Sequence, residues 1–376
     1  AVGSGVNYRI GTSIRSATAM TRISPEKQLS PWRSPPLRRS AGSASRSPFP
    51  KASRSSWGSY SSSDYQPRPA LQYCRPQHQQ EQHGPNPDED ESINLNPINL
   101  VLIKLCERSA EDAVDLSPNE ERTKHILSYL NKTTGDTISV GFIDPLGGCK
   151  CKAVVLQRQN GGVRLVPKPA TIIWPQNNLP EITLILAVPY PARMKYLWPV
   201  IASFSAVTRV VIVSAQRSNP EYMRSTVLQP PVYEPLIERG MSQGGRTRPV
   251  KVDVCMKEEV ISRNLLARLG LIRKRNNNNN TDRTARVFLG CGDEYTTPPP
   301  AREVVVARCG KQSDVAPLAI VAIGPERGWT DGEATVFVNE CGFKSAMLGS
   351  STLRVDTAVM TGLAVISAAL DECKSE

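Results

Sequence analysis

Histidine is scarce in this chain of 376 residues, and the shortage excludes several kinds of active site. Only three histidines occur, and His125 is the single one outside the N-terminal segment that holds the other two. A metal centre built on several histidines is therefore excluded, and a Ser-His-Asp triad would have to use His125. No metal ion is expected.

Disulfide, zinc and membrane signals are missing as well. The nine cysteines form no CxxC pair, and Cys149 and Cys151 stand too close together to begin a zinc site. An odd number of cysteines in a chain of this length favours free thiols in a reducing compartment. Apolar runs stay far below the ~20 residues of a membrane span, and no P-loop motif occurs. We therefore expect neither membrane insertion nor a P-loop nucleotidase.

Acidic residues are rare only at the start of the chain. Residues 1–87 contain 12 lysines and arginines, 17 serines and only 3 acids, whereas the remainder is nearly balanced in charge. Such a composition cannot bury a core, so we predict a disordered basic leader over residues 1–92. An Arg- and Ser-rich, acid-poor leader is typical of a transit peptide, which predicts a chloroplast or mitochondrial location. A cytoplasmic protein with a disordered basic tail is the alternative.

The segment 93–180 predicts a small β-barrel, because short strands are separated by Gly- and Pro-containing turns around a single helix. A Pro-rich linker, Pro167–Pro180, ends it. The expected strands are Leu100–Leu105, Thr137–Ile143, Lys150–Leu156 and Gly162–Val166, and the expected helix is Glu120–Leu130.

From residue 181 to 376 strands and helices alternate, which predicts an α/β domain with a parallel sheet and helices on both faces. Arg273–Thr284 and Tyr295–Arg302 are predicted as loop insertions. The expected strands are Ile182–Val188, Arg209–Val213, Lys251–Cys255, Arg286–Leu289, Leu318–Ile323 and Ser345–Leu348. The expected helices are Ala192–Phe204, a stretch around Tyr233–Met241, Glu258–Leu269, Gly332–Asn339 and Thr357–Leu370.

A Gly-containing loop after a buried strand is the first candidate site. Its sequence, IGPERGWTDGE, runs from Ile323 to Glu333. Ligands of open α/β folds lie at the carboxyl ends of strands, and glycines let the backbone approach a ligand closely. Thr330 and Glu333 form a capping box, which predicts a helix start. By contrast, Gly290-Cys291-Gly292-Asp293 is a lone G-x-G and predicts a plain turn.

A second loop of the same kind, MLGSSTLRVDTA, begins at Met347 and ends at Ala358. It places Arg354 and Asp356 at the mouth of an apolar helix. Each loop alone fits an ordinary strand-to-helix turn, and the two charged residues alone fit a solvated flank and a favourable first-turn acid. Because two adjacent loops can enclose one ligand, we interpret the pair as a binding site.

Together, IGPERGWTDGE and LGSSTLRVDTAV resemble the signature of the RsmE family, SPOUT-class methyltransferases that modify N3 of a uridine in small-subunit ribosomal RNA. The family pattern is GPEGG with an acid on the next helix, then LG, LR and [DE]TA. The resemblance covers roughly Asn99–Leu370 and is strongest in the last fifty residues. Upstream motifs that resemble the family's E-R-S, Q-x-x-R and R-x-x-H are Gln216-Arg217-Ser218, Gln243 with Arg246, and Arg122 with His125.

The chain departs from the family pattern at several places. Arg327 replaces a glycine of GPEGG, which puts a large cationic side chain on the first loop. The helix after the first strand of the α/β domain lacks the usual Q-K-A-T-E-L-G, and the insertions around Asn276–Asn280 and Pro298–Pro300 are not typical. These departures concern the substrate and the site more than the enzyme class.

The resemblance implies an α/β fold of the SPOUT type: a trefoil-knotted parallel-sheet domain preceded by a PUA-like β-barrel. It also implies a homodimer with active sites at the subunit interface. The implied cofactor is S-adenosyl-L-methionine, and the implied partner is small-subunit (16S-type) ribosomal RNA or the assembling small subunit. Two alternatives stay open: a SPOUT methyltransferase with another RNA target, and a non-catalytic RNA-binding factor of ribosome assembly.

Site residues are carried over on the matching motifs. Arg354 is expected to stabilise negative charge on the uracil ring during catalysis, and Asp356 to orient it or to accept the proton. The residues implied in cofactor binding, mostly through their backbone, are Ile323, Gly324, Pro325, Glu326, Gly328, Leu348, Gly349, Thr352 and Leu353. The residues implied in RNA binding are Arg122, His125, Arg217, Gln243 and Arg246.

Overall fold

The computed structural model describes residues 100–109, 113–144, 148–175, 179–256, 259–272, 284–290, 297–310 and 316–373. The predicted leader, residues 1–92, lies outside these residues. So do the Asn-rich insertion Asn276–Asn280 and all but the first residue of the Gly290–Asp293 turn.

The N-terminal sheet is a five-stranded, nearly closed barrel in the order β1-β3-β4-β5-β2. Arg108, just beyond β1, bridges to Val114 of β2, which brings the two ends of the sheet together. Alternate residues of the strands point inward and form one buried apolar core. The strands are β1 (Val101–Lys104), β2 (Val114–Leu116), β3 (Thr137–Ile143), β4 (Cys149–Gln157) and β5 (Val163–Pro167).

The barrel confirms the predicted strands and adds one that the pattern did not reveal. Strand β2 has only three residues, too few for alternation to stand out. The predicted helix is present as α1 (Glu121–Lys124), continued by the π-helical turn η3 (His125–Tyr129). Ile126 of this helix packs into the barrel core. Two short 3-10 turns, η2 (Leu105–Glu107) and η4 (Pro169–Thr171), complete this part.

The second sheet has six parallel strands in the order β11-β9-β10-β6-β7-β8. The central strands are nearly continuous runs of Ile, Leu, Val and Ala, as expected for a sheet that is buried on both faces. The strands are β6 (Glu181–Ala187), β7 (Val207–Val213), β8 (Lys251–Val254), β9 (Ala285–Leu289), β10 (Leu318–Ile323) and β11 (Lys344–Ala346).

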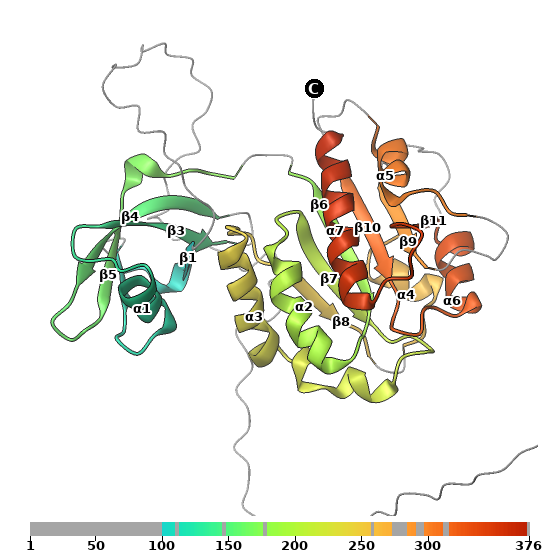
Figure 1. Ribbon diagram of the computed structural model, residues 1–376, viewed down its shortest axis with the longest axis horizontal. Coiled ribbons are helices and arrows are strands. Elements are labelled where there is room, and N and C mark those ends of the chain that lie inside the picture. Colours follow the sequence, from blue (N-terminus) through green and yellow to red (C-terminus); the bar gives the residue numbers. More distant parts are fainter. Residues whose placement is uncertain are drawn as a thin grey trace, which may run out of the picture. The chain divides into compact units, whose positions relative to one another are not determined.

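Helices cover both faces of this sheet and bury two separate apolar clusters. Figure 1 shows α2, α3 and α7 crossing one face. Buried side chains of α2, α3, α5 and α7 form the larger cluster, and those of α4 and η7 contribute to the smaller one. The helices are α2 (Pro191–Ser203), α3 (Pro230–Gln243), α4 (Arg263–Arg268), α5 (Ala301–Cys309), α6 (Asp331–Thr335) with its extension η7 (Val336–Glu340), and α7 (Val355–Glu372). Two 3-10 turns, η5 (Pro220–Arg224) and η6 (Thr226–Leu228), follow β7.

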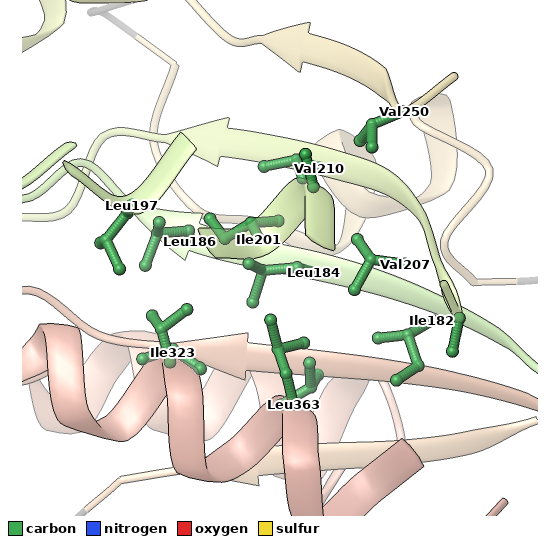
Figure 2. Packing of buried hydrophobic residues seen from close by; sticks show 14 of the residues in the cluster. Ile182, Leu184, Leu186, Leu197, Ile201, Val207, Val210, Val250, Ile323 and Leu363 are labelled. Carbon is green, nitrogen blue, oxygen red and sulfur yellow. The ribbon is translucent and has the colours of Figure 1, made fainter. Parts of the chain in front are cut away.

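The contact between the sheet and helix α7 anchors the larger cluster. Figure 2 shows Leu184 of β6 and Leu363 of α7 pointing toward one another, with Ile323 of β10 beside them. All three side chains are 2% exposed or less. Burial of one such side chain stabilises the fold by about 1.5–3 kcal/mol, so this contact holds the last helix firmly against the strand ends.

One predicted loop is wrong. Residues 301–309, of which the first two were assigned to the loop insertion Tyr295–Arg302, form helix α5. Three valines and the preceding prolines hide its helical pattern, because β-branched residues favour strands. Only tertiary contacts reveal its buried side, since Ala301, Val305 and Cys309 pack into the larger cluster. Helix α4 also begins later than predicted, at Arg263, where the hydroxyl oxygen of Ser262 caps it.

Candidate functional site

Both candidate loops lie at the same end of the parallel sheet, where the strands have their carboxyl ends. Strands β11, β9 and β10 are neighbours, so their carboxyl ends at Ala346, Leu289 and Ile323 meet there. The first loop leaves β10 at Ile323, and the second follows β11 and reaches helix α7 at Arg354. The strand order therefore places the two loops at the same end of the sheet, on either side of the end of β9.

Helix α7 packs against this end of the sheet, and a glycine of the helix lies at the contact. A Cβ atom on Gly362 would lie 3.0 Å from Leu289 Cδ1 and 3.7 Å from Cδ1 of both Ile323 and Leu348. The residues that end or follow three different strands thus converge on one point of α7. A side chain at position 362 would press on Leu289, so the glycine allows α7 to approach the strand ends closely.

The first loop is buried at its start and exposed at its turn. Ile323, Gly324 and Pro325 are buried, whereas Glu326 and Arg327 are exposed. A Cβ atom on Gly324 would lie 3.0 Å from Cδ1 and Nε1 of Trp329, so the indole packs directly against the loop backbone.

The turn explains how the first loop tolerates Arg327. Gly328 has a φ of +70°, the left-handed conformation that favours glycine, and its N–H donates to Pro325 O at 2.8 Å. Arg327 is not among the described non-glycine residues with positive φ. An arginine therefore fits at position 327 without backbone strain, and its side chain projects to the surface.

Two carboxylates tie the first loop to neighbouring segments. Glu326 Oε1 accepts hydrogen bonds from the backbone N–H of Tyr190 and from Arg193 Nη1, both at 2.9 Å. Glu333, only 2% exposed, accepts from the Gln216 N–H at 2.8 Å through Oε1. Glu333 Oε2 completes the predicted capping box with Thr330, which is confirmed. The side chain of Glu326, expected in cofactor binding, is thus already engaged in holding the loop.

The second loop has an unusual backbone at one glycine. Gly349 is exposed and has a φ of +151°, a conformation that L-residues rarely adopt. No heavy atom lies within 4 Å of the position a Cβ atom would take there. Leu348 and Leu353 are half-buried and Thr352 is exposed. At Gly349 the loop therefore presents its backbone to open space.

Arg354 and Asp356 stand where the second loop enters helix α7. Arg354 is the N-cap residue, with 68% of its side chain exposed, and its Nε lies 3.4 Å from Asp356 Oδ1. The two charges form an ion pair but not a hydrogen bond. Asp356 Oδ1 is buried and has no hydrogen-bond partner among the described residues. This pair therefore offers an exposed guanidinium at the second loop, next to a buried carboxylate oxygen.

The comparisons with known proteins now identify the family. A family model described as an RNA methyltransferase domain matches residues 175–367, just over half of the chain. The chain belongs to this RNA methyltransferase domain family.

The RsmE resemblance is confirmed by the family match and by a relative that is similar in sequence. Ribosomal RNA small subunit methyltransferase E of Treponema pallidum is 20% identical over 277 residues, which cover 72% of this chain and 91% of the relative. A probable rRNA-methyltransferase from Porphyromonas gingivalis is similar in structure, with a TM-score of 0.50, 16% identity and coverage of 72% and 99% of the two chains. A ribosomal RNA small subunit methyltransferase E from Neisseria gonorrhoeae, solved with bound S-adenosyl methionine, has a TM-score of 0.47 at 18% identity, covering 72% of this chain and 97% of its own.

Within the RNA methyltransferase domain, Arg217 lies against the first loop. Its Nη1 donates to the carbonyl oxygens of Trp329 at 3.0 Å and of Arg327 at 3.4 Å. The expected RNA contact is thus also a brace of the loop. Gln243, the last residue of α3, is exposed and stays a predicted RNA contact.

The prediction that Arg246 contacts RNA directly is corrected by the structure, because Arg246 lies in the interior. It is 5% exposed and donates to the carbonyl oxygens of Phe204 and Val207, both at 2.7 Å, and of Arg248 at 2.9 Å. Burial lowers the pKa of its guanidinium to about 10, so the group still carries its charge at neutral pH. It satisfies the backbone between α2 and β7, and this placement leaves no surface for a direct RNA contact.

In the barrel, Arg122 is engaged by acids. It donates to Glu107 at 2.7 and 2.9 Å and to Glu120 at 2.6 and 3.1 Å. Burial opposes charging of Glu107, but hydrogen bonds from Arg122 and from the Lys104 N–H outweigh it and lower the pKa of Glu107. The charge of Arg122 is thus matched within the barrel, which argues against a phosphate contact.

His125 stays a predicted RNA contact. It is half-buried and packs beside the exposed ring of Tyr129, with 5.9 Å between ring centroids. Neither Arg122 nor His125 is brought to the loops of the methyltransferase domain by any described hydrogen bond.

The described part of the chain contains no metal site and no membrane helix. No group of three or more His, Cys, Asp or Glu side chains is arranged to hold a metal ion within the described ranges. Among the helices that the structure describes, none is both long and apolar enough to span a bilayer. None of the seven described cysteines is in a disulfide, and burial raises the pKa of Cys151 to about 12.

The sequence indicated only some of the residues that brace the first loop. Tyr190, Arg193 and Gln216 act on the first loop from more than a hundred residues away. A usable signal existed for Glu333, through its capping box, and for Gln216 and Arg217, through the motif that they share. The contacts of Tyr190 and Arg193 follow from the strand order, which places the carboxyl ends of β6 and β7 at the same end of the sheet as the carboxyl end of β10.

Proposed function

We propose that this chain transfers a methyl group to N3 of a uridine in small-subunit ribosomal RNA. The observation that carries the proposal is the pair of glycine loops at adjacent strand ends, with Arg354 and Asp356 at the head of α7, in a chain of the RNA methyltransferase domain family. The Treponema relative supports the choice of ribosomal RNA.

The residues of the two loops fit S-adenosylmethionine as the methyl donor. Gly349 leaves open space where a side chain would stand, and Trp329 Nε1 is a buried donor without a hydrogen-bond partner among the described residues, beside Gly324. The backbones from Ile323 to Gly328 and from Leu348 to Leu353 would hold the cofactor. When bound, it supplies an electrophilic methyl group that passes from its sulfonium to N3, and S-adenosylhomocysteine is left.

Arg354 and Asp356 would act on the uracil ring. Uridine N3 becomes a good nucleophile only when its proton leaves, and the ring then carries negative charge. An arginine cannot serve as a base at neutral pH, so Arg354 would donate charge-assisted hydrogen bonds to the ring oxygens. Asp356, whose Oδ1 lies 3.4 Å from Arg354 Nε, would hold the guanidinium in place or take the proton.

Nucleoside mass spectrometry tests the reaction. The purified chain, S-adenosylmethionine and unmodified small-subunit RNA are incubated, and the RNA is digested and searched for 3-methyluridine. We expect 3-methyluridine to appear in the digest. A methyl group on another base or on a ribose would show a different RNA target. No methylation with intact RNA binding would favour the non-catalytic assembly factor, although the strain-free backbone at Arg327 removes one reason to expect it.

The trefoil knot and the homodimer also remain proposals. Support for the knot comes from the backbone pairing of Met347 with Pro299 and Ala301, which lays the second loop beside the segment before α5. Light scattering of the purified chain would measure the dimer, and a monomer mass would contradict it.

The leader is proposed to direct the protein to an organelle, on the basis of its Arg- and Ser-rich, acid-poor composition. Fusion of residues 1–92 to a fluorescent reporter should carry the reporter into chloroplasts or mitochondria. The remaining chain should keep its methyl-transfer activity in vitro. A reporter that stays in the cytosol would contradict this proposal.

A further inference from the structure

An exposed tyrosine, Tyr190, stands next to the first loop and packs against the half-buried Tyr222. Tyr190 follows the carboxyl end of β6, which pairs in parallel with β10, and it is the N-cap residue of α2. Its backbone N–H donates to Glu326 Oε1 at 2.9 Å, so the position of Tyr190 is tied to the loop. The side-chain ring of Tyr190 meets that of Tyr222 edge to face, with centroids 5.7 Å apart and an angle of 73°.

This ring is held in place and yet open to solvent. Tyr190 is 52% exposed, although burying an aromatic side chain is favourable. The edge contact with Tyr222 restricts the tilt of the ring and leaves about half of the residue uncovered. A fixed, uncovered aromatic ring is the element on which proteins stack unpaired nucleic-acid bases.

The charges around the ring favour a polyanion. Arg193 is paired with Glu326 at 2.9 Å, so these two charges cancel. Arg217 and Arg327 are exposed on the same edge, and neither forms an ion pair with a carboxylate among the described residues. Two cations at the first loop, to which the backbone of Tyr190 is bonded, suit a nucleotide, whose base stacks while its phosphates meet the positive charge.

We propose that Tyr190, supported by Tyr222, is the stacking platform for an unpaired base of the substrate RNA, next to the nucleotide that is methylated. Arg217 and Arg327 would face the phosphates of the same strand. The inference rests on the proposed function and deepens it, because it requires the target uridine to lie in an unpaired segment. Tyr190 would position the RNA and would take no part in the chemistry.

Truncation of Tyr190 tests the platform. Tyr190→Ala keeps the backbone N–H that binds Glu326, so the loop should retain its position. We expect about tenfold weaker binding of short single-stranded oligouridine, measured by fluorescence anisotropy, which corresponds to ~1.4 kcal/mol. Binding of a base-paired RNA of equal length should change much less. In methylation assays KM for RNA should rise while kcat changes little.

Matched variants separate stacking from other effects. Tyr190→Phe keeps the ring and should bind oligouridine within about twofold of wild type, whereas Tyr190→Leu, which keeps apolar bulk without the ring, should resemble the alanine variant. Tyr196→Ala removes an equally exposed tyrosine from the same helix, at 56% exposure, and should have no effect. The melting temperature and S-adenosylmethionine affinity are measured for each variant.

Several results would overturn the proposal. Wild-type affinity in Tyr190→Ala would do so, and it would point instead to a protein partner for this ring. Equal binding by the leucine and phenylalanine variants would rule out stacking. Weaker S-adenosylmethionine binding in Tyr190→Ala would assign the ring to the cofactor site. If the wild-type chain methylates RNA in any of these cases, only the platform fails, whereas a wild-type chain that neither binds nor methylates RNA would refute the proposed function itself.

Discussion

Replacing Arg354 by alanine should slow methyl transfer by about a hundredfold or more. This is the scale of removing one preorganised donor that faces developing negative charge. Affinity for S-adenosylmethionine should change little, because the cofactor contacts are assigned to the loop backbones. Arg354→Lys should restore only part of the rate, since a point charge does not reproduce the planar guanidinium. Single-turnover methylation, with calorimetry for the cofactor, measures both quantities.

Stability data strengthen this test. The Arg354 side chain is 68% exposed and its pairing with Asp356 at 3.4 Å lacks a hydrogen bond, so losing the pair should cost less than ~1 kcal/mol of folding free energy. A large rate loss in a variant of normal stability would thus be functional. Arg302→Ala is the matched control, since it removes another exposed arginine, paired with Glu372 near the far end of α7. If Arg354→Ala turns over at the wild-type rate, the catalytic assignment is wrong.

Gly349→Ala should weaken S-adenosylmethionine binding by roughly thirty- to a hundredfold. The added methyl group would enter the open space beside the second loop, where the cofactor is proposed to lie. The φ of +151° would also strain the alanine and shift the loop backbone. Crowding of a packed contact costs about 2–3 kcal/mol, which corresponds to this range of affinity. Isothermal calorimetry on the folded variant gives the value.

A control at another glycine separates the effect of backbone strain in Gly349→Ala from the effect of crowding the cofactor. Gly342 has a φ of +72°, and a Cβ atom added there would likewise have no heavy atom within 4 Å. This glycine precedes β11 and therefore lies at the opposite end of the sheet, where the strands have their amino ends. Gly342→Ala should therefore lower the melting temperature without changing cofactor affinity. Unchanged affinity in Gly349→Ala, or an equal loss in both variants, would show that the second loop is an ordinary turn.

Local pattern was sufficient to predict most of the secondary structure and the position of the two loops. The strands of the second sheet are apolar runs because both of their faces are buried, and this burial is written in the residues themselves. Thr330 and Glu333 form their capping box over three residues, so the start of α6 is a local property too. The glycines at the strand ends indicated the two loops because they, too, are a local feature of the sequence.

The sequence by itself therefore determined the α/β alternation, both glycine loops and the Arg354–Asp356 pair, all of which depend on neighbours within a few residues. Only the tertiary structure decided what each arginine does. Arg246 is buried against carbonyl oxygens about forty residues away, and Arg217 reaches carbonyl oxygens more than a hundred residues away. An arginine on the surface and one in the interior look alike in a sequence, because their hydrogen-bond acceptors are backbone atoms that only the strand order brings together. The same strand order places Tyr190 beside the first loop.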